Sequence, residues 1–130
     1  LESIRLGISH VAASRSGRIL HVEDDSDIAV IVDSLLGSDC QVVHAESLQQ
    51  ARAYLNAEVF DLVLLDIGLP DGSGLDLLPI LNSRELQTPV IIFSAQDVSP
   101  DIAAQVNGTL VKSKTDNEKL IQQIKLAINK

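Results

Sequence analysis

The chain has 130 residues and a mass of 14.0 kDa, which is enough for one domain with a buried core and no disulfide or metal to hold it together. Eighteen acidic and ten basic side chains give a formal charge of −8, which argues against direct nucleic-acid binding or adsorption to anionic membranes. The single cysteine excludes an internal disulfide and a cysteine zinc cluster, so we expect a cytoplasmic protein. The apolar runs are too short for membrane insertion, and the lack of methionine indicates a piece of a longer chain.

The hydrophobic pattern alternates in type from Gly17 onward. Short apolar runs predict strands, and the segments between them carry apolar side chains at the spacing of one helix face. In chain order, we expect a strand at 19–22, a helix at 28–36, a strand at 41–45, a helix at 47–55, a strand at 59–65, a helix at 75–81, a strand at 90–93, a short helix from 99, a strand at 109–111 and a helix at 115–128.

Local patterns mark the ends of three of these helices. Gly37 is placed to stop the first helix. Ser47 with Gln50, and Thr115 with Glu118, have the spacing of a capping box, in which two side chains satisfy backbone N–H groups of the first helical turn. We therefore expect the second and the last helix to begin at these hydroxyl residues.

Five strand–helix units in sequence predict a single α/β domain. Parallel strands need crossover connections, so we expect a doubly wound, five-stranded parallel sheet with helices on both faces. The flavodoxin-like strand order 2-1-3-4-5 is the commonest for five units. Residues 1–17 contain four serines and no capped pattern, which indicates a linker or tail there and a folded domain at 18–130.

Chemically useful side chains follow four of the predicted strands. Glu23 and Asp24 follow the first strand and Asp66 follows the third, and these strands flank the point where the strand order reverses and ligands usually bind. Neighbouring carboxylates need a proton or a cation between them, and Mg²⁺ suits such oxygen ligands. Ser94 and Lys112 end the fourth and fifth strands. A metal, an ammonium group and a carboxylate acceptor are the parts that phosphoryl transfer needs.

Each acidic or polar residue also has an ordinary structural explanation. We expect Asp25 and Asp27 simply to stabilise the positive start of the following helix. Asp66 fits that explanation less well, because no helix begins directly after it. Ser94 or Lys112 alone would indicate little. Their joint occurrence at the ends of separate strands is what favours a functional site.

Five segments of the chain resemble the receiver domain of two-component response regulators. They occur in the family's order and with compatible gaps, from about Arg18 to Asn129. The segments are RILHVEDD at 18–25, DLVLLD at 61–66, LPDGSGL at 69–75, VIIFSA at 90–95 and LVK at 110–112.

The resemblance implies a role for each residue of the predicted site. Asp66 would be the phosphoacceptor and would attack the phosphohistidine of a histidine kinase or phosphotransfer domain. Mg²⁺ would be held by Glu23, Asp24, Asp66 and the backbone carbonyl of Gly68. The residues that bind the phosphoryl group or switch in response to it would be Ser94, Ala95, Lys112 and Thr109.

Glu23 in place of aspartate is a common variant of the family's pattern, and two further positions depart from it. Thr109 stands where the family usually has a switching aromatic residue, and Ser113 replaces the proline that usually follows the lysine. The segment between Ser94 and Lys112 is also short, which predicts a trimmed fourth helix. In the family, the usual signalling face consists of that helix, the fifth strand and the fifth helix. The resemblance implies that a homodimer could form through this face. We expect retained chemistry and an altered readout.

The leading hypothesis is a phosphoaccepting receiver domain of a phosphorelay, within a larger regulator or a hybrid histidine kinase. Such a domain is a signalling protein that catalyses only its own phosphoryl transfer and hydrolysis. The alternative, motivated by Thr109 and Ser113, is an interaction module that signals without phosphate. An aspartate-dependent phosphatase would need an acid at the position of Gly68. A histidine metal site is disfavoured because the three histidines have no clustered partners.

Overall fold

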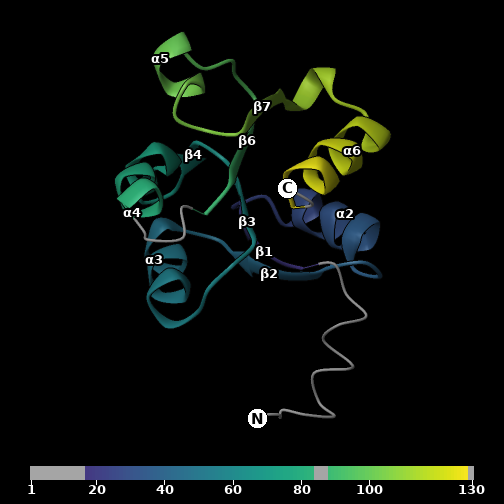
Figure 1. Ribbon diagram of the computed structural model, residues 1–130, viewed down its shortest axis with the longest axis horizontal. Helices are drawn as coiled ribbons and strands as arrows, with labels where there is room; N and C mark the ends of the chain where they lie inside the picture. Colours follow the sequence, from purple (N-terminus) through teal and green to yellow (C-terminus); the bar gives the residue numbers. More distant parts are fainter. Residues whose placement is uncertain (1–16, 84–87, 129–130) are drawn as a thin grey trace.

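The computed structural model describes residues 17–83 and 88–128, so all of the predicted tail except Gly17 lies outside the described residues. Its main strands are β1 (Arg18–Val22), β2 (Gln41–Ala45), β3 (Leu62–Leu65), β6 (Val90–Ser94) and β7 (Gly108–Val111). They form one parallel sheet in the order β2-β1-β3-β6-β7, which confirms the predicted order 2-1-3-4-5 (Figure 1). The helices are α2 (Ser26–Leu36), α3 (Leu48–Ala57), α4 (Leu78–Ser83), α5 (Pro100–Ala103) and α6 (Asn117–Ile128).

Helices cover both faces of the sheet, as the doubly wound arrangement requires (Figure 1). Leu20, Val63 and Ile92 belong to the core under α3 and α4. Leu64 and Ile91 belong to the core under α2 and α6. Successive strand residues point to opposite faces, so a strand that is covered on both sides must be apolar throughout. This explains the uninterrupted apolar runs in β3 and β6.

The third strand is shorter than predicted, because it begins at Leu62 and not at residue 59. Val59 is 59% exposed, so its apolar side chain does not belong to the sheet's core. Asp61 is instead bound to the start of β1: its carboxylate accepts a hydrogen bond from the backbone N–H of Arg18 (2.7 Å), and its own N–H donates to the carbonyl of Arg18 (2.8 Å). An apolar run alone does not distinguish a strand from the turn before it.

The predicted capping residue of the last helix, Thr115, is wrong by one residue, and the helix itself begins at Asn117. The carboxylate of Asp116 accepts a hydrogen bond from the N–H of Lys119 (2.8 Å) and so caps α6. The hydroxyl of Thr115 donates to the carbonyl of Val111 (2.8 Å) instead of pairing with Glu118 as a capping box. Threonine and aspartate are both good capping residues, so the sequence pattern does not choose between two that are adjacent.

The capping residue of α3 is the predicted one, although the box is incomplete. The hydroxyl of Ser47 accepts a hydrogen bond from the N–H of Gln50 (3.2 Å). The side-chain oxygen of Gln50 accepts from the N–H of Glu46 (2.8 Å), one residue before the cap. At the end of α2, the helix stops at Leu36, just before Gly37, as expected.

The segment between β3 and α4 has more regular structure than the turn-rich sequence predicts. β4 (Gly68–Leu69) and β5 (Gly72–Ser73) pair as a two-residue antiparallel ladder. A 3₁₀ turn, η1 (Gly74–Leu77), follows and leads directly into α4, so the helix predicted at 75–81 is only partly α-helical.

The helices are short. α5 has four residues, which fits the predicted trimmed helix, and α6 has twelve.

Within 17–83 and 88–128, the structure contains no helix of the length and apolarity that a membrane span requires.

Candidate functional site

Three carboxylates meet where β1 and β3 end. These strands are neighbours, with Val22 opposite Leu65, so the residues that follow them lie side by side. Each of Glu23, Asp24 and Asp66 offers a ligand oxygen, and these oxygens all lie within 4.8 Å of one another. The structure therefore brings together the three acids that the sequence places at this edge of the sheet.

An ammonium group lies against two of these acids. Lys112 begins η2 (Lys112–Lys114), directly after β7, and its Nζ is 2.8 Å from Oε1 of Glu23 and 3.3 Å from Oδ2 of Asp66. Glu23 is 1% exposed and Asp66 is 7% exposed, so water screens these contacts little. The contact with Asp66 was expected, whereas the shorter contact with Glu23 was not.

Burial and mutual repulsion change the proton affinities of this cluster. Burial raises the pKa of Glu23 to about 7, since the charged form loses hydration; Lys112 opposes this change, and the Asp66 carboxylate adds to it. Burial also lowers the pKa of Lys112, but the carboxylates of Glu23 and Asp66 outweigh that effect and the pKa is raised overall. The lysine therefore stays charged, and Glu23 is the acid that exchanges a proton near neutrality.

Backbone groups hold the Asp66 carboxylate in place. Its Oδ1 accepts a hydrogen bond from the N–H of Ile67 (2.8 Å), and its own N–H donates to the carbonyl of Val22 in β1 (3.0 Å). Oδ2 faces Lys112. Both oxygens thus have a hydrogen-bond donor beside them, which fixes the orientation of the carboxylate.

The remaining predicted site residues lie at strand ends or on a nearby strand. Ser94 is the last residue of β6 and is buried, and Ala95 follows it at the surface. Gly68 is exposed at the start of β4. Thr109 is exposed on β7, three residues before Lys112. Because β6 and β7 are parallel to β1 and β3, Ser94 and Lys112 reach the same edge of the sheet as the acids.

Asp25 and Asp27 have the structural role that we expected. Oδ1 of Asp25 accepts hydrogen bonds from the N–H groups of Asp27 (2.9 Å) and Ile28 (3.3 Å), so Asp25 is the N-cap of α2. Asp27 lies in the first helical turn, where a negative charge is favourable.

Asp71 has a structural role that was not predicted from the sequence. Its carboxylate accepts hydrogen bonds from the N–H groups of Leu48 (2.8 Å) and Gln49 (3.0 Å), which tie the β4–β5 hairpin to the start of α3. These bonds, first that from Leu48, lower the pKa of Asp71. A helix leaves several N–H groups unsatisfied at its start, and Ser47 satisfies one, so an acid from a nearby turn was a reasonable candidate for the others.

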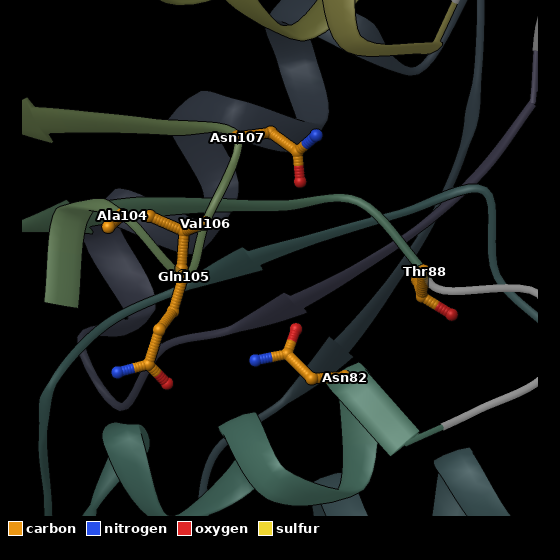
Figure 2. Close-up of a pocket in the computed structure, with 6 residues that line it drawn as sticks. All are labelled: Asn82, Thr88, Ala104, Gln105, Val106 and Asn107. Atoms are coloured by element: carbon orange, nitrogen blue, oxygen red, sulfur yellow. The ribbon is translucent and has the colours of Figure 1, made fainter.

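A cavity of about 370 Å³ lies at the opposite edge of the sheet. It opens where β6 and β7 begin, and three carboxamides, one hydroxyl and two small apolar residues line it (Figure 2). Its lining residues are Asn82, Thr88, Ala104, Gln105, Val106 and Asn107. This cavity has a neutral lining and is separate from the acidic site.

The acidic site fits a hard divalent cation. Three carboxylates lie close together and one lysine contacts two of them, so the cluster keeps an excess of negative charge when all four groups are ionised. A cation among these oxygens would relieve that repulsion. Carboxylate oxygens are ligands that Mg²⁺ accepts, and Asp24 is exposed to solvent.

Replacing Lys112 by methionine is expected to destabilise the metal-free protein by about 2 kcal/mol near pH 8, because Glu23 and Asp66 lose their counter-charge. The loss should be smaller near pH 6, where Glu23 can take up a proton. Urea unfolding in a chelator measures both values. Lys114→Met, an exposed lysine in the same turn, is the control. Equal loss at both pH values would contradict the proposed dependence on Glu23.

Comparison with known proteins confirms the family that the sequence resembles and the fold described above. Residues 19–125 match the response regulator receiver domain. The response regulator protein PilR of Pseudomonas aeruginosa is 40% identical over 79 residues, which are 60% of this chain and 18% of PilR, so the chain spans less than a fifth of that relative.

Two solved structures are similar over more than four fifths of the chain. The non-phosphorylated HemR receiver domain of Leptospira biflexa has a TM-score of 0.78 at 26% identity, covering 87% of this chain and 94% of that one. TrrA of Thermotoga maritima, solved with Mg²⁺ and BeF, has a TM-score of 0.75 at 25% identity, covering 85% and 97%. With the family match over most of its length, the chain belongs to the response regulator receiver domains of two-component signalling systems.

Proposed function

We propose that this chain is the phosphoaccepting receiver domain of a two-component phosphorelay. Asp66 takes the phosphoryl group from the phosphohistidine of a histidine kinase or phosphotransfer domain. The observation that carries the proposal is the group of three carboxylates within 4.8 Å, with the ammonium of Lys112 beside the acceptor carboxylate. The alternative, a module that signals without phosphate, would not require this complete set of groups.

In the proposed reaction, a carboxylate oxygen of Asp66 attacks phosphorus. An O–P bond forms, the N–P bond of phosphohistidine breaks, and the departing imidazole takes a proton from solvent. Lys112 and the N–H of Ile67 hold the carboxylate in place before the attack. As charge moves onto the phosphoryl oxygens, Lys112 pairs with them, Ser94 donates a hydrogen bond to them, and Ala95 leaves room for them.

Mg²⁺, when bound, supplies positive charge to the phosphoryl oxygens. The proposed ligands are the carboxylates of Glu23, Asp24 and Asp66 and the backbone carbonyl of Gly68. Glu23 and Asp66 are held by Lys112, while Asp24 is exposed at the rim of the site. The exposed acid therefore leaves the site accessible from solvent.

The proposal extends to the rest of the chain. We place the receiver domain at 18–130, a linker or tail at 1–17, and the protein in the cytoplasm. Its charge of −8 argues against direct contact of this domain with nucleic acid. A homodimer, if phosphorylation drives one, would use α5, β7 and α6, where Thr109 is exposed in place of the family's aromatic switch residue.

Incubation with acetyl phosphate and Mg²⁺, followed by intact mass measurement, tests the function. We expect one added phosphoryl group, lost on treatment with hydroxylamine, and no addition when a chelator replaces Mg²⁺. An unchanged mass with metal bound would favour the phosphate-independent module.

The affinity for Mg²⁺ should depend on pH through Glu23. The pKa of Glu23 is raised from 4.5 to about 7, so the carboxyl group of the folded, metal-free protein holds a proton below about pH 7. A metal ion that binds there must displace this proton. From about pH 8 to pH 6 the affinity is expected to fall roughly tenfold. Calorimetric titration measures it. In Glu23→Gln the affinity should be weaker but nearly constant over this range; an unchanged pH slope would assign the proton to another group.

A further inference from the structure

His44 is hydrogen-bonded to the backbone of the acidic site. Its Nε2 lies 2.6 Å from the carbonyl oxygen of Glu23. A carbonyl oxygen can only accept a hydrogen bond, so Nε2 carries the hydrogen and donates it. The ring thus contacts the peptide group that joins Glu23 to Asp24, two of the three clustered acids.

Neighbouring residues fix the position of this ring. His44 lies on β2 directly opposite His21 on β1, and the two ring centroids are 6.0 Å apart. His21 is 1% exposed, so it offers a fixed surface for the second ring. The N–H of Glu23 also donates to the carbonyl of Ala45 (2.9 Å). Consecutive residues at the end of β2 therefore hold both backbone polar groups of Glu23.

Holding this carbonyl orients the next residue as well. The carbonyl belongs to a planar peptide group that also contains Cα of Asp24, so a hydrogen bond to this carbonyl restrains the path of the chain into Asp24. The side chain of Glu23 has other support, from Lys112 and from the N–H of Asp25 (3.3 Å). For the exposed carboxylate of Asp24, no such bond is found among residues 17–83 and 88–128, so its direction depends on the backbone.

We propose that His44 is a positioning residue for the metal site: by donating Nε2–H to the Glu23 carbonyl, it directs Asp24 toward the position of the cation. The inference rests on the proposed function, because it assumes that these acids bind a metal. His44 itself is not a ligand. Residues that orient metal ligands through hydrogen bonds typically change affinity by about tenfold or more when replaced.

The test compares substitutions at His44 with a matched control. His44→Leu removes the donor and puts an apolar side chain beside a cleft of about 310 Å³ that Ala29, Val30 and Val42 also line. His44→Gln restores an N–H donor at nearly the position of Nε2. Val42→Ala, two residues earlier on the same strand, reduces packing at the cleft without touching the Glu23 carbonyl. The probe is Mg²⁺ alone, titrated while the backbone amides of residues 23 and 24 are followed by ¹⁵N NMR.

We expect affinity roughly tenfold weaker for His44→Leu, largely recovered in His44→Gln, and close to wild type in Val42→Ala. Equal affinities for wild type and His44→Leu would overturn this inference alone, whereas no Mg²⁺ binding by the wild-type protein would overturn it together with the proposed metal site. Ring ¹⁵N shifts of the metal-free wild type give a reading that needs no variant. They should show His44 protonated at Nε2, and protonation at Nδ1 alone would also refute the proposal.

Discussion

Asp66→Asn is expected to eliminate the acid-labile phosphorylation completely. Asparagine has nearly the same shape and can still accept the hydrogen bond from the N–H of Ile67, so the fold should persist. It lacks the carboxylate nucleophile, however, and cannot form an acyl phosphate. Removing one negative charge also relieves repulsion with Glu23, so the metal-free variant should be at least as stable as the wild type. Intact mass and urea unfolding measure the two effects.

Asp97→Asn is the matched control for this experiment. Asp97 is an exposed aspartate in the segment after β6, beyond the same edge of the sheet, and is not one of the three clustered acids. The control should gain the phosphoryl group as the wild type does. If Asp66→Asn still gained a hydroxylamine-sensitive phosphoryl group, the acceptor would be a different carboxylate.

The fold was predictable because the hydrophobic pattern of the sequence follows from which faces of the strands and helices are buried. β3 and β6 are covered on both faces, so they had to be apolar throughout, and the segments between strands had to present one apolar side. General rules for parallel sheets then limited the strand order. The ends of the strands and helices were less predictable. Asp61 binds Arg18 and β3 begins only after it, and Asp116 rather than Thr115 caps α6.

The location of the site was predictable for a topological reason, whereas its contacts were not. Residues that follow parallel strands meet at one edge, so the sequence could place Glu23, Asp66 and Lys112 together. Which carboxylate lies nearer to the lysine depends on side-chain conformation. The contacts of Asp71 with α3 and of His44 with Glu23 join segments more than twenty residues apart, and no local pattern records them.

Gly74→Ala is expected to lower the free energy of unfolding by about 3 kcal/mol, the upper end of what overpacking usually costs, because the clash is with rigid backbone. Gly74 is buried, and its N–H donates to the carbonyl of Ile67 (2.7 Å). A Cβ at this position would lie 1.9 Å from the backbone oxygen of Asp66 and 3.0 Å from its carbonyl carbon. Both contacts are with backbone, so a change of side-chain rotamer cannot relieve them. Urea unfolding measures the loss.

Gly68→Ala separates this steric effect from a general intolerance of the loop to alanine. A Cβ on Gly68 would have no atom within 4 Å, and its backbone is outside the left-handed region, so we expect a change in stability within about 0.5 kcal/mol. If both variants lost the same stability, close packing on Asp66 would not be the cause. If only Gly74→Ala lost stability, the cause would be the close approach of Gly74 to the main chain of Asp66. A side chain at position 74 would then have to displace Asp66 from the acids and the lysine that surround it.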